Sequence, residues 1–363
     1  MKPLTIAHVL SSFALGGQER VALDLATAQL KMGHRVHAIS LAPPPDGVLA
    51  KDFAARGVTL HTVPKGDGID LTLITRLRAV FRREAIDVVH THNPQPLFYG
   101  ATAGRLAGAV VVHTKHGVNP DGGRRLWLRR LGGHLVHAYV AVSDATAKTA
   151  REKAECPPGH LHTIANGIEL DAFKPDPEAR RAIRDELGIP QDAFVFGTVG
   201  RVSKEKDHAH FIRSAAPLLG PGVRLVIVGD GDAMPAVREE AEKVAPFVVL
   251  AGVRRDIPRV LPSFDVFVLS SRSEGLPLAL VEAMAAGLPI VSTDVGGTRE
   301  VLADAGLIVA PRDEEALRGA MRTLLESEDE RRKFQARAPV RARHYDARRM
   351  SDEYLAIYRA ALG

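Results

Sequence analysis

The chain has almost no cysteine, few aromatic side chains and no long apolar run. Cys156 is the only cysteine among 363 residues, so no disulfide can form within the chain, which fits a reducing compartment. Tryptophan, tyrosine and phenylalanine together make up 5% of the residues. No apolar run approaches the roughly 18 residues that a membrane-spanning helix needs. With 45% hydrophobic and 25% charged residues, the composition is that of a globular protein and excludes wholesale disorder.

The length and the first residues of the chain indicate how it is organised. A chain of 363 residues is too long for one ordinary hydrophobic core and predicts two domains. Residues 1–17 begin like a secretory signal, with a lysine before an apolar stretch. His8, Ser11 and Ser12 interrupt that stretch, and no small-residue cleavage site follows it. We therefore interpret this segment as the first strand of a sheet.

Positive charge and histidine are concentrated in the first half of the chain. Residues 1–166 hold 20 Lys and Arg against 12 Asp and Glu, a net charge of +8, and they hold 12 of the 15 histidines. The arginines are not interleaved with aromatics, which disfavours nucleic acid and leaves an anionic membrane surface or a phosphorylated substrate. Two basic stretches, 76–83 and 124–130, are either a solvated face or, around Trp127, a surface that rests on anionic lipid.

Short β-like runs alternate with amphipathic helical stretches, which is the pattern of a parallel sheet covered by helices on both faces. The strands expected in the first half are Leu4–Leu10, Arg35–Leu41, Val58–Val63, Asp87–Thr91, Val110–Thr114 and Leu135–Val142. Those expected in the second half are Phe194–Thr198, Arg224–Val228, Val248–Leu250, Val266–Leu269, Pro289–Ser292 and Leu307–Val309. This order predicts an α/β fold of two similar doubly wound domains that face each other. Ligands are expected in a cleft at the carboxyl ends of the strands.

Proline and glycine interrupt the alternation near the middle of the chain. Asn166-Gly167 and three prolines surround one short charged helical stretch between residues 166 and 190. We therefore expect the first domain in residues 1–166, a linker in 167–190, the second domain in 191–344 and a separate C-terminal segment in 345–363.

The strongest motif is the segment 273–284, which follows an apolar run of the second half. Pro277 suits the first turn of a helix, and Gly275 just before it lets a ligand approach the backbone closely. Such a helix start favours an anion, because its unpaired N–H groups and the helix dipole both attract negative charge. Glu282 is the only charged residue between Gly275 and Thr293, so we expect it on a largely buried helix. Its carboxylate would either accept hydrogen bonds from ribose or sugar hydroxyls or pair with an arginine.

A second motif, the segment 200–207, follows the first strand expected in the second half. Arg201 and Lys206 place two cations there, where they can clamp a diphosphate, and the aspartate that ends the segment can cap the next helix. Taken alone, a charged loop is usually only a solvated loop. Two glycine turns, 228–231 and 252–254, follow the next two strands. Four strand ends of one sheet that carry glycines or cations predict a common ligand site.

In the first half, Gly16 and Gly17 lie between the first expected strand and its helix. No G-x-G-x-x-G pattern is present and no acidic residue ends the run 35–41, so a nicotinamide enzyme is disfavoured. The two glycines either bring backbone amides close to a phosphate or sugar, or they serve only as a tight turn.

Histidines end two successive strands of the first half. His90 and His92 share one face of a strand, and His113 and His116 lie at the end of the next one. No carboxylate or cysteine accompanies them at ligand spacing, so we interpret them as polar lining and expect no metal. We favour His116 for contact with a ligand, because it lies near the expected switch point of the sheet.

These residues resemble the retaining glycosyltransferases of family 4, which have the two-domain GT-B fold. The matching residues are Glu274 and Glu282, separated by seven residues as in that family, Gly200-Arg201 with Lys206, Gly16-Gly17, His116, Asn166-Gly167 and the segment Gly296–Glu300. The resemblance covers nearly the whole chain, and the block 265–300 is its most specific part. It implies two facing Rossmann-like domains and a C-terminal helix in residues 345–363 that crosses back onto the first domain.

The resemblance also implies roles for individual residues. Those expected in catalysis are His116, Arg201, Lys206 and Glu274. Those expected to bind the donor are Gly16, Gly17, Gly200, Gly229, Val253, Arg254, Gly275, Leu276 and Glu282. In this assignment the two cations hold the diphosphate, Glu274 holds the sugar and Glu282 the ribose. The backbone around Val253 and Arg254 meets the base.

The implied activity is transfer of a sugar, with retention, from a nucleoside diphosphate sugar such as a UDP- or GDP-sugar, without a metal or cofactor. The implied acceptor is a lipid-linked, polysaccharide or small-molecule acceptor of cell-envelope synthesis. Two alternatives are a nucleotide-sugar 2-epimerase of the same fold and a non-catalytic nucleotide-sugar-binding module. The basic first half predicts a cytoplasmic enzyme, peripheral on the inner face of the cell membrane, that binds no nucleic acid.

Overall fold

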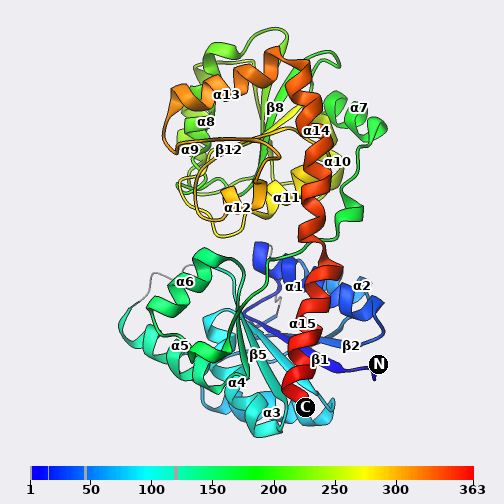
Figure 1. Cartoon of the computed structure of the whole chain (residues 1–363), viewed down its shortest axis with the longest axis vertical. Helices are drawn as coiled ribbons and strands as arrows, with labels where there is room; N and C mark the ends of the chain where they lie inside the picture. The colour runs from blue at the N-terminus through cyan, green and yellow to red at the C-terminus, as the bar shows by residue number, and fades with distance from the viewer. Residues whose placement is uncertain (1, 15, 45–46, 118–121) are drawn as a thin grey trace. The chain divides into compact units, whose positions relative to one another are not determined.

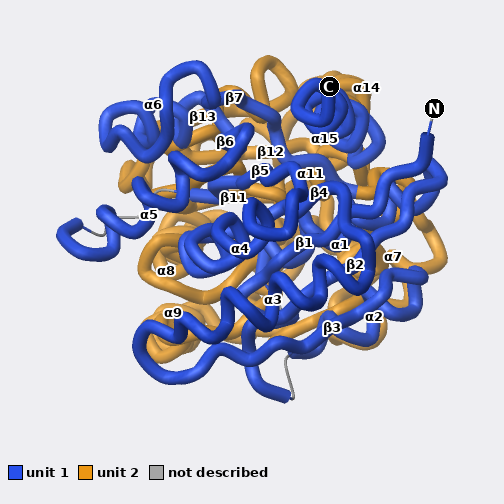
Figure 2. The backbone as a smooth tube through the Cα atoms, turned by 90° about the horizontal axis from the view of Figure 1, so that it is seen from below, with its two compact units in different colours: residues 1–168, 346–363 blue, residues 169–345 orange. Residues whose placement is uncertain are grey.

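The computed structural model describes residues 2–14, 16–44, 47–117 and 122–363. The chain forms two compact units, which Figure 2 shows in different colours. The first unit contains Met1–Ile168 together with Asp346–Gly363, and the second contains Glu169–Tyr345. Each unit is built on one sheet of its own.

The sheet of the first unit has seven strands in the order β3-β2-β1-β4-β5-β6-β7, and neighbouring strands are parallel. The strands are β1 (Thr5–Leu10), β2 (Arg35–Ser40), β3 (Thr59–Thr62), β4 (Val88–His92), β5 (Val110–Lys115), β6 (Ala138–Ala141) and β7 (Leu161–Thr163). The register aligns His8 of β1 with His90 of β4, and His92 with Thr114 of β5. The three central strands are buried along their whole length, as expected for a parallel sheet covered on both faces.

Helices cover both faces of this sheet (Figure 1). They are α1 (Gly17–Lys31), α2 (Ala50–Ala55), α3 (Thr72–Arg83), α4 (Pro94–Ala107), α5 (Gly123–Leu135), α6 (Asp144–Glu152) and α15 (Ala347–Leu362), with the 3-10 turn η1 (Pro158–His160). Ala7 and Val9 of β1 share a core cluster with Leu73 of α3 and Leu97 of α4. Leu10, at the end of the same strand, belongs to the cluster that includes α1 and α2. The C-terminal helix α15 packs against α1, so the chain returns to its first unit.

The sheet of the second unit has six parallel strands in the order β10-β9-β8-β11-β12-β13. They are β8 (Phe194–Val199), β9 (Val223–Val228), β10 (Val248–Gly252), β11 (Val266–Leu269), β12 (Ile290–Thr293) and β13 (Leu307–Val309). The helices are α7 (Pro177–Glu186), α8 (His208–Ala215), α9 (Met234–Glu242), α10 (Ile257–Val260), α11 (Leu278–Ala285), α12 (Thr298–Leu302), α13 (Glu314–Glu326) and α14 (Glu328–Ala342). Four 3-10 turns complete the unit: η2 (Leu170–Ala172), η3 (Ala216–Leu218), η4 (Leu261–Ser263) and η5 (Arg343–Tyr345). One core cluster joins the strands to α8, α9, α13 and α14.

Local chemistry explains where several helices begin. Ser143 precedes α6, and its hydroxyl accepts a hydrogen bond from the amide of Thr146 at 3.2 Å. Asp176 caps α7 in the same way, because its carboxylate accepts from two amides of the first turn. Pro94 opens α4, where its missing N–H costs no helical hydrogen bond. On α3, Leu73, Leu77, Val80 and Phe81 recur at helical spacing and form its buried face.

The architecture confirms the expected fold class: two doubly wound parallel sheets and a C-terminal helix that returns to the first unit. Most expected strands shift by only one or two residues at an end. The expected run Leu135–Val142 shortens to β6 because α5 continues to Leu135. The strand β7 was not expected, since its Leu-His-Thr sequence is short and partly exposed. In the range 167–190, residues from Glu169 onward belong to the second unit.

A transmembrane helix is absent from the part of the chain that the structure describes, where every helix is too short or too polar to cross a bilayer.

Candidate functional site

A group of charged side chains at the strand ends of the second unit is centred on Lys206 and Glu274. The ammonium of Lys206 donates to Glu274 Oε1 at 2.6 Å, and the hydroxyl of Ser271 donates to the same oxygen at 2.5 Å. The Glu274 side chain is 8% exposed and that of Lys206 is 24% exposed. The structure thus joins two predicted site residues, from the loops that follow β8 and β11, in one partly buried ion pair.

Hydrogen bonds hold these two loops together. Ser270, directly after β11, donates from its hydroxyl to the carbonyl oxygens of Lys206 and Asp207, at 3.0 and 3.1 Å. The guanidinium of Arg272 donates to the carboxylate of Asp207 at 2.5 Å. The expectation that the Asp207 side chain caps α8 is wrong, because this carboxylate binds Arg272 and makes no hydrogen bond to the helix amides. The Asp207 carboxylate thus links the two loops, and these hydrogen bonds fix the backbone on both sides of the Lys206–Glu274 pair.

Glycines allow the strand ends to approach each other closely. Gly229 follows β9 with a φ of 141°, and an added Cβ there would lie 1.9 Å from the carbonyl oxygen of Gly200. The amide of Gly229 donates to the carbonyl of Gly252 at 2.8 Å. An added Cβ at Gly296, which follows β12, would lie 1.9 Å from the carbonyl oxygen of Glu274. Any larger residue at Gly229 or Gly296 would therefore push these loops apart.

The two other predicted basic residues of this unit have different surroundings. The Arg201 side chain is 76% exposed, and its guanidinium lies 3.9 Å from a carboxylate oxygen of Asp232. The guanidinium of Arg254 instead donates to the carboxylates of Glu186 and Asp256. Arg254 is therefore committed to carboxylates, which leaves its backbone and the 62%-exposed Val253 as the parts that can meet a ligand.

Helix α11 begins one residue later than expected. Pro277 occupies the N-cap position and α11 starts at Leu278, after Gly275 and the nearly buried Leu276. Glu282 is only half-buried, although its neighbours on either side along the helix are buried. It lies one turn after Leu278 on the same, partly open face of the helix. That face can offer a carboxylate to a ligand.

In the first unit, Gly16 and Gly17 form the start of α1. Gly16 is the N-cap residue in an extended conformation, and α1 begins at Gly17. The carboxylate of Glu19 lies beneath this turn, only 4% exposed, and accepts a hydrogen bond from the Gln18 amide at 2.7 Å. Burial raises the pKa of Glu19. Glu19 was not among the predicted site residues, and the sequence signal that could have found it is its position three residues after Gly16. In the structure, an added Cβ at Gly16 would lie 2.3 Å from the Glu19 carboxylate, so the glycine leaves room for it.

The predicted histidines separate onto two faces of the sheet. His116 follows β5, and its Nε2 lies 2.9 Å from His92 Nδ1. His113 lies on the other face, where it contacts Thr91 and the ring of Tyr139. Burial lowers the pKa of His116 to about 4, so the ring is neutral near pH 7. Its Nδ1 is buried and has no hydrogen-bond partner in the described part of the chain.

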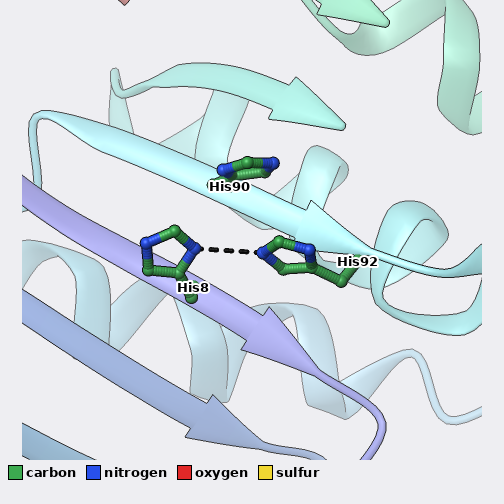
Figure 3. A group of neighbouring side chains, drawn as sticks. All are labelled: His8, His90 and His92. Atoms are coloured by element: carbon green, nitrogen blue, oxygen red, sulfur yellow. Dashed lines mark hydrogen bonds between the residues drawn. The ribbon is translucent and has the colours of Figure 1, made fainter. Parts of the chain in front are cut away.

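Three histidines of the first unit are close enough to hold a metal ion, namely His8, His90 and His92 (Figure 3). Each of their six ring nitrogens is already in a hydrogen bond: His8 with His92 and Gln29, His90 with Tyr358 and Thr114, and His92 with His8 and His116. A neutral imidazole has one N–H and one lone pair. The network therefore satisfies all three rings without an ion.

A cavity of about 680 Å³ opens within the first unit at the carboxyl ends of β1 and β4. Lys65, Arg125 and Arg129 contribute basic groups to its lining, and Phe98 and Tyr99 contribute aromatic rings. No lining residue in the described part of the chain is acidic. The cavity is therefore suited to an anionic ligand that also has an apolar or sugar surface.

The basic stretch on α5 is divided between the interior and the surface. Arg129 is 2% exposed, and its guanidinium lies 3.4 Å from a carboxylate oxygen of Glu155, whose other oxygen accepts from Lys115 at 2.7 Å. The interpretation of Arg129 as part of a solvated face is therefore wrong. Trp127 and Leu131 remain 61% and 41% exposed on this helix.

Comparisons with known proteins agree with this geometry. Residues 15–172 match the family model described as Glycosyltransferase Family 4, and residues 193–327 match Glycosyl transferases group 1. A GDP-mannose-dependent alpha-mannosyltransferase of Mycobacterium tuberculosis is 30% identical over 387 residues, covering 99% of this chain and 97% of that protein. The UDP-Gal:alpha-D-GlcNAc-diphosphoundecaprenol alpha-1,3-galactosyltransferase of Escherichia coli is 28% identical over 313 residues, covering 81% of this chain and 80% of that one. The structure of Anabaena Alr3699/HepE in complex with UDP-glucose superposes with a TM-score of 0.85 at 20% identity, covering 98% of this chain and all of that chain.

The fold and the loops at its strand ends thus define a GT-B glycosyltransferase that uses nucleotide sugars. The chain belongs to glycosyltransferase family 4, within the glycosyl transferases of group 1.

Proposed function

We propose that the protein is a retaining glycosyltransferase that moves a hexose from a nucleoside diphosphate sugar to a phosphate-bearing, lipid-linked acceptor of the cell envelope. The observation that carries the donor half of this proposal is the Lys206–Glu274 pair, braced between two loops at the strand ends of the second unit. A cation that meets a diphosphate beside a carboxylate that meets sugar hydroxyls is the combination that an activated sugar requires.

In this reaction the bond between the anomeric carbon and the diphosphate oxygen breaks, and the same face of that carbon bonds to the acceptor oxygen. The proton of the acceptor hydroxyl passes to the leaving phosphate, so the carboxylate of Glu274 does not act as a nucleophile. Lys206, the exposed Arg201 and the amides at the start of α11 stabilise the negative charge that grows on the leaving group. Glu274 holds sugar hydroxyls, Glu282 holds the ribose, and the backbone at Val253 meets the base.

We propose that these cations supply the positive charge and that no metal is needed. Transfer that survives an excess of EDTA supports this proposal. Loss of transfer in EDTA, with recovery on addition of Mg²⁺ or Mn²⁺, contradicts it without affecting the assignment as a transferase.

The cavity of the first unit supports an acceptor that contains phosphate. Its lining combines Lys65, Arg125 and Arg129 with two aromatic rings and no described carboxylate, although Arg129 is paired with Glu155 behind the lining. The E. coli relative bears a name that specifies a diphosphoundecaprenol acceptor. Lys65 and Arg125 would bind the acceptor phosphates, and Phe98 would lie against the first sugar or the lipid.

We further propose that the exposed face of α5 rests on the anionic inner surface of the cell membrane. Arg124 and Arg130 accompany the exposed Trp127 and Leu131 on this helix. Co-sedimentation with phosphatidylglycerol vesicles at low salt should be strong and should weaken markedly in a Trp127→Ser variant. Equal sedimentation with neutral phosphatidylcholine vesicles contradicts the electrostatic part of this proposal.

A mass-spectrometric screen of UDP-, GDP- and ADP-sugars tests the reaction, with undecaprenyl-diphosphate-linked sugars and free oligosaccharides as acceptors. A glycosylated acceptor supports transfer, and the anomeric configuration of the new bond, read by NMR, tests retention. Isomerised donor without acceptor indicates an epimerase. Donor that binds but stays unchanged with every acceptor indicates a binding module.

A further inference from the structure

Four side chains of the first unit form a single-file chain of hydrogen bonds across the sheet. Gln29 Oε1 on α1 lies 2.8 Å from His8 Nε2, and His8 Nδ1 lies 3.0 Å from His92 Nε2. His92 Nδ1 lies 2.9 Å from His116 Nε2. The contact between His8 and His92 is the dashed line in Figure 3, between the neighbouring strands β1 and β4. We call these four residues the imidazole chain.

The rings of the imidazole chain are neutral at physiological pH. Burial lowers the pKa of His8 and of His116 to about 4, and it lowers the pKa of His92 well below its ordinary value, with further lowering from neighbouring histidines. Each neutral ring carries one N–H and one lone pair. The position of one proton in the chain therefore decides the position of the next.

The amide of Gln29 sets the direction of the chain. Its oxygen can only accept, so His8 must carry its proton on Nε2 and accept at Nδ1. His92 must then donate from Nε2 to His8 and accept at Nδ1, and His116 must donate from Nε2 to His92. His116 consequently ends the chain with an unprotonated Nδ1, the buried atom that has no partner in the described part of the chain.

The C-terminal helix contacts the other end of the Gln29 amide. The nitrogen of the Gln29 amide lies 3.4 Å from the hydroxyl of Tyr358 on α15, and that hydroxyl lies 2.6 Å from His90 Nδ1. If Gln29 donates to Tyr358, the hydroxyl proton of Tyr358 goes to His90. His90 then donates from Nε2 to Thr114 at 2.7 Å. The reverse orientation satisfies the same contacts but leaves His116 with its proton on the buried Nδ1, which has no acceptor in the described part of the chain. Buried N–H groups without an acceptor are rarer than buried acceptors without a donor, so the orientation with Gln29 Oε1 toward His8 is favoured.

We propose that Gln29, His8 and His92 are positioning residues that fix the tautomer of His116, so that its Nδ1 presents a lone pair to a hydroxyl of the donor sugar. The proposal rests on the proposed function, because it takes the sugar as the group that His116 meets. It differs from an acid–base dyad, since the chain ends on an uncharged amide and not on a carboxylate. His116 thereby serves as a neutral hydrogen-bond acceptor that adds no positive charge beside the sugar.

The tautomer is measured directly in the full-length protein by nitrogen-15 NMR of labelled histidine side chains. A His116→Asn variant identifies the His116 resonances by their loss. We expect His116 to show an unprotonated Nδ1 and a protonated Nε2 in the wild-type protein near pH 7. A protonated Nδ1 there overturns the proposal without the need for any further variant.

A Gln29→Met variant should reverse the chain. Methionine fills a similar volume but cannot accept the proton of His8 Nε2, and a buried N–H without an acceptor is costly. The proton of His8 should therefore move to Nδ1, and each following ring should change in turn until His116 carries its proton on Nδ1. The matched control is Tyr354→Phe, which removes a buried hydroxyl of α15 that bonds Thr114 at 2.7 Å but lies outside the imidazole chain. It should leave the tautomer unchanged, and an unchanged tautomer in Gln29→Met overturns the proposal.

Binding then tests whether His116 faces the sugar. A hydroxyl that donates to the Nδ1 lone pair in the wild-type protein must rotate and give up its alignment in order to accept from an Nδ1 proton. Gln29→Met should therefore weaken the affinity for the nucleotide sugar by about three- to tenfold. Its affinity for the nucleoside diphosphate, which has no sugar, should not change. Equal affinities for the sugar nucleotide in both proteins overturn the assignment of the sugar as the partner of Nδ1. A wild-type protein that neither binds nor consumes any nucleotide sugar refutes the proposed function instead, and the NMR result then stands apart from it.

Discussion

Replacing Glu274 by glutamine should have opposite effects on nucleotide binding and on sugar transfer. In the free protein, the Lys206 ammonium lies 2.6 Å from the Glu274 carboxylate. At that distance and an effective dielectric constant of about 20, their attraction is about 6 kcal/mol before desolvation is subtracted. A diphosphate that takes Lys206 as a ligand must compete with this attraction and with the negative charge of Glu274.

The Glu274→Gln variant removes the competitor but keeps the shape of the side chain. A charge-assisted hydrogen bond contributes roughly 1.5–3 kcal/mol, so nucleoside diphosphate should bind about 10- to 100-fold more tightly. Sugar transfer should fall by about a hundredfold or more, because the amide no longer accepts strong hydrogen bonds from the sugar hydroxyls. Lys206→Met should weaken nucleotide binding by a similar factor.

Calorimetric titration with UDP, GDP and ADP measures these affinities, and a coupled assay measures transfer. Glu314→Gln is the matched control. It breaks an ion pair of the same 2.6 Å length in the same unit, between Arg213 on α8 and Glu314 on α13, and should leave both quantities unchanged. Weaker nucleotide binding by Glu274→Gln would refute the reasoning, since it would mean that the carboxylate supports the diphosphate or that Lys206 is not its ligand.

Three further predictions concern charge and burial. Arg201→Ala should lower turnover by about a hundredfold. Its free energy of unfolding, measured in urea, should stay within about 0.5 kcal/mol of that of the wild-type protein, because the Arg201 side chain is 76% exposed; unchanged turnover would exclude Arg201 from the leaving-group site. Glu155→Gln should lower the free energy of unfolding by about 3–5 kcal/mol, because the Glu155 carboxylate is fully buried beside Lys115 and accepts from Tyr139 at 2.7 Å; an unshifted urea midpoint would contradict this. Acid should destabilise the first unit between pH 6.5 and about 4, since burial lowers the folded-state pKa of His8 and His116 to about 4 and the unfolded chain binds the extra protons in that window. The free energy of unfolding should fall by about 1.4 kcal/mol per pH unit for each histidine. Hydrogen exchange of β4 in urea measures this free energy at pH 7 and pH 5, and an equal or higher value at pH 5 would contradict the prediction.

The alternation of strands and helices could be predicted because the physics that sets it is local. Buried parallel strands need apolar runs of a few residues, and the helices between them need an apolar stripe at helical spacing. The strands β11 and β13 end at the residues that their apolar runs predict. The short strand β7 could not be predicted from apolar content, because two of its three side chains are exposed. Its place in the sheet comes from backbone pairing with β6.

The contacts within the site could not be predicted, because they join residues that are distant in the sequence. Lys206 and Glu274 were both predicted site residues, but they lie 68 residues apart, and neither loop sequence indicates that the two side chains form an ion pair. Asp207 was expected to cap a helix because that is the commonest use of aspartate before one, and a tertiary partner, Arg272, took its carboxylate instead. Arg129 shows the same effect, since a buried carboxylate draws it inward from a surface stretch.

The two candidate constellations differ in a way that follows from the charges that each would meet. In the second unit, the Lys206 ammonium is paired with the Glu274 carboxylate. A diphosphate can bind this ammonium by displacing the carboxylate or by sharing the ammonium with it. In the first unit, burial lowers the pKa of the histidines in the imidazole chain, so their rings are neutral near pH 7, and the uncharged amide of Gln29 orients them. A neutral lone pair is what a sugar hydroxyl can use without disturbing the positive field that the leaving group needs. For this reason Gln29→Met should alter only the part of the affinity that depends on the sugar. A Gln29→Met variant that weakened the binding of nucleoside diphosphate and of nucleotide sugar by the same factor would show that the histidines of the imidazole chain do not act through the sugar.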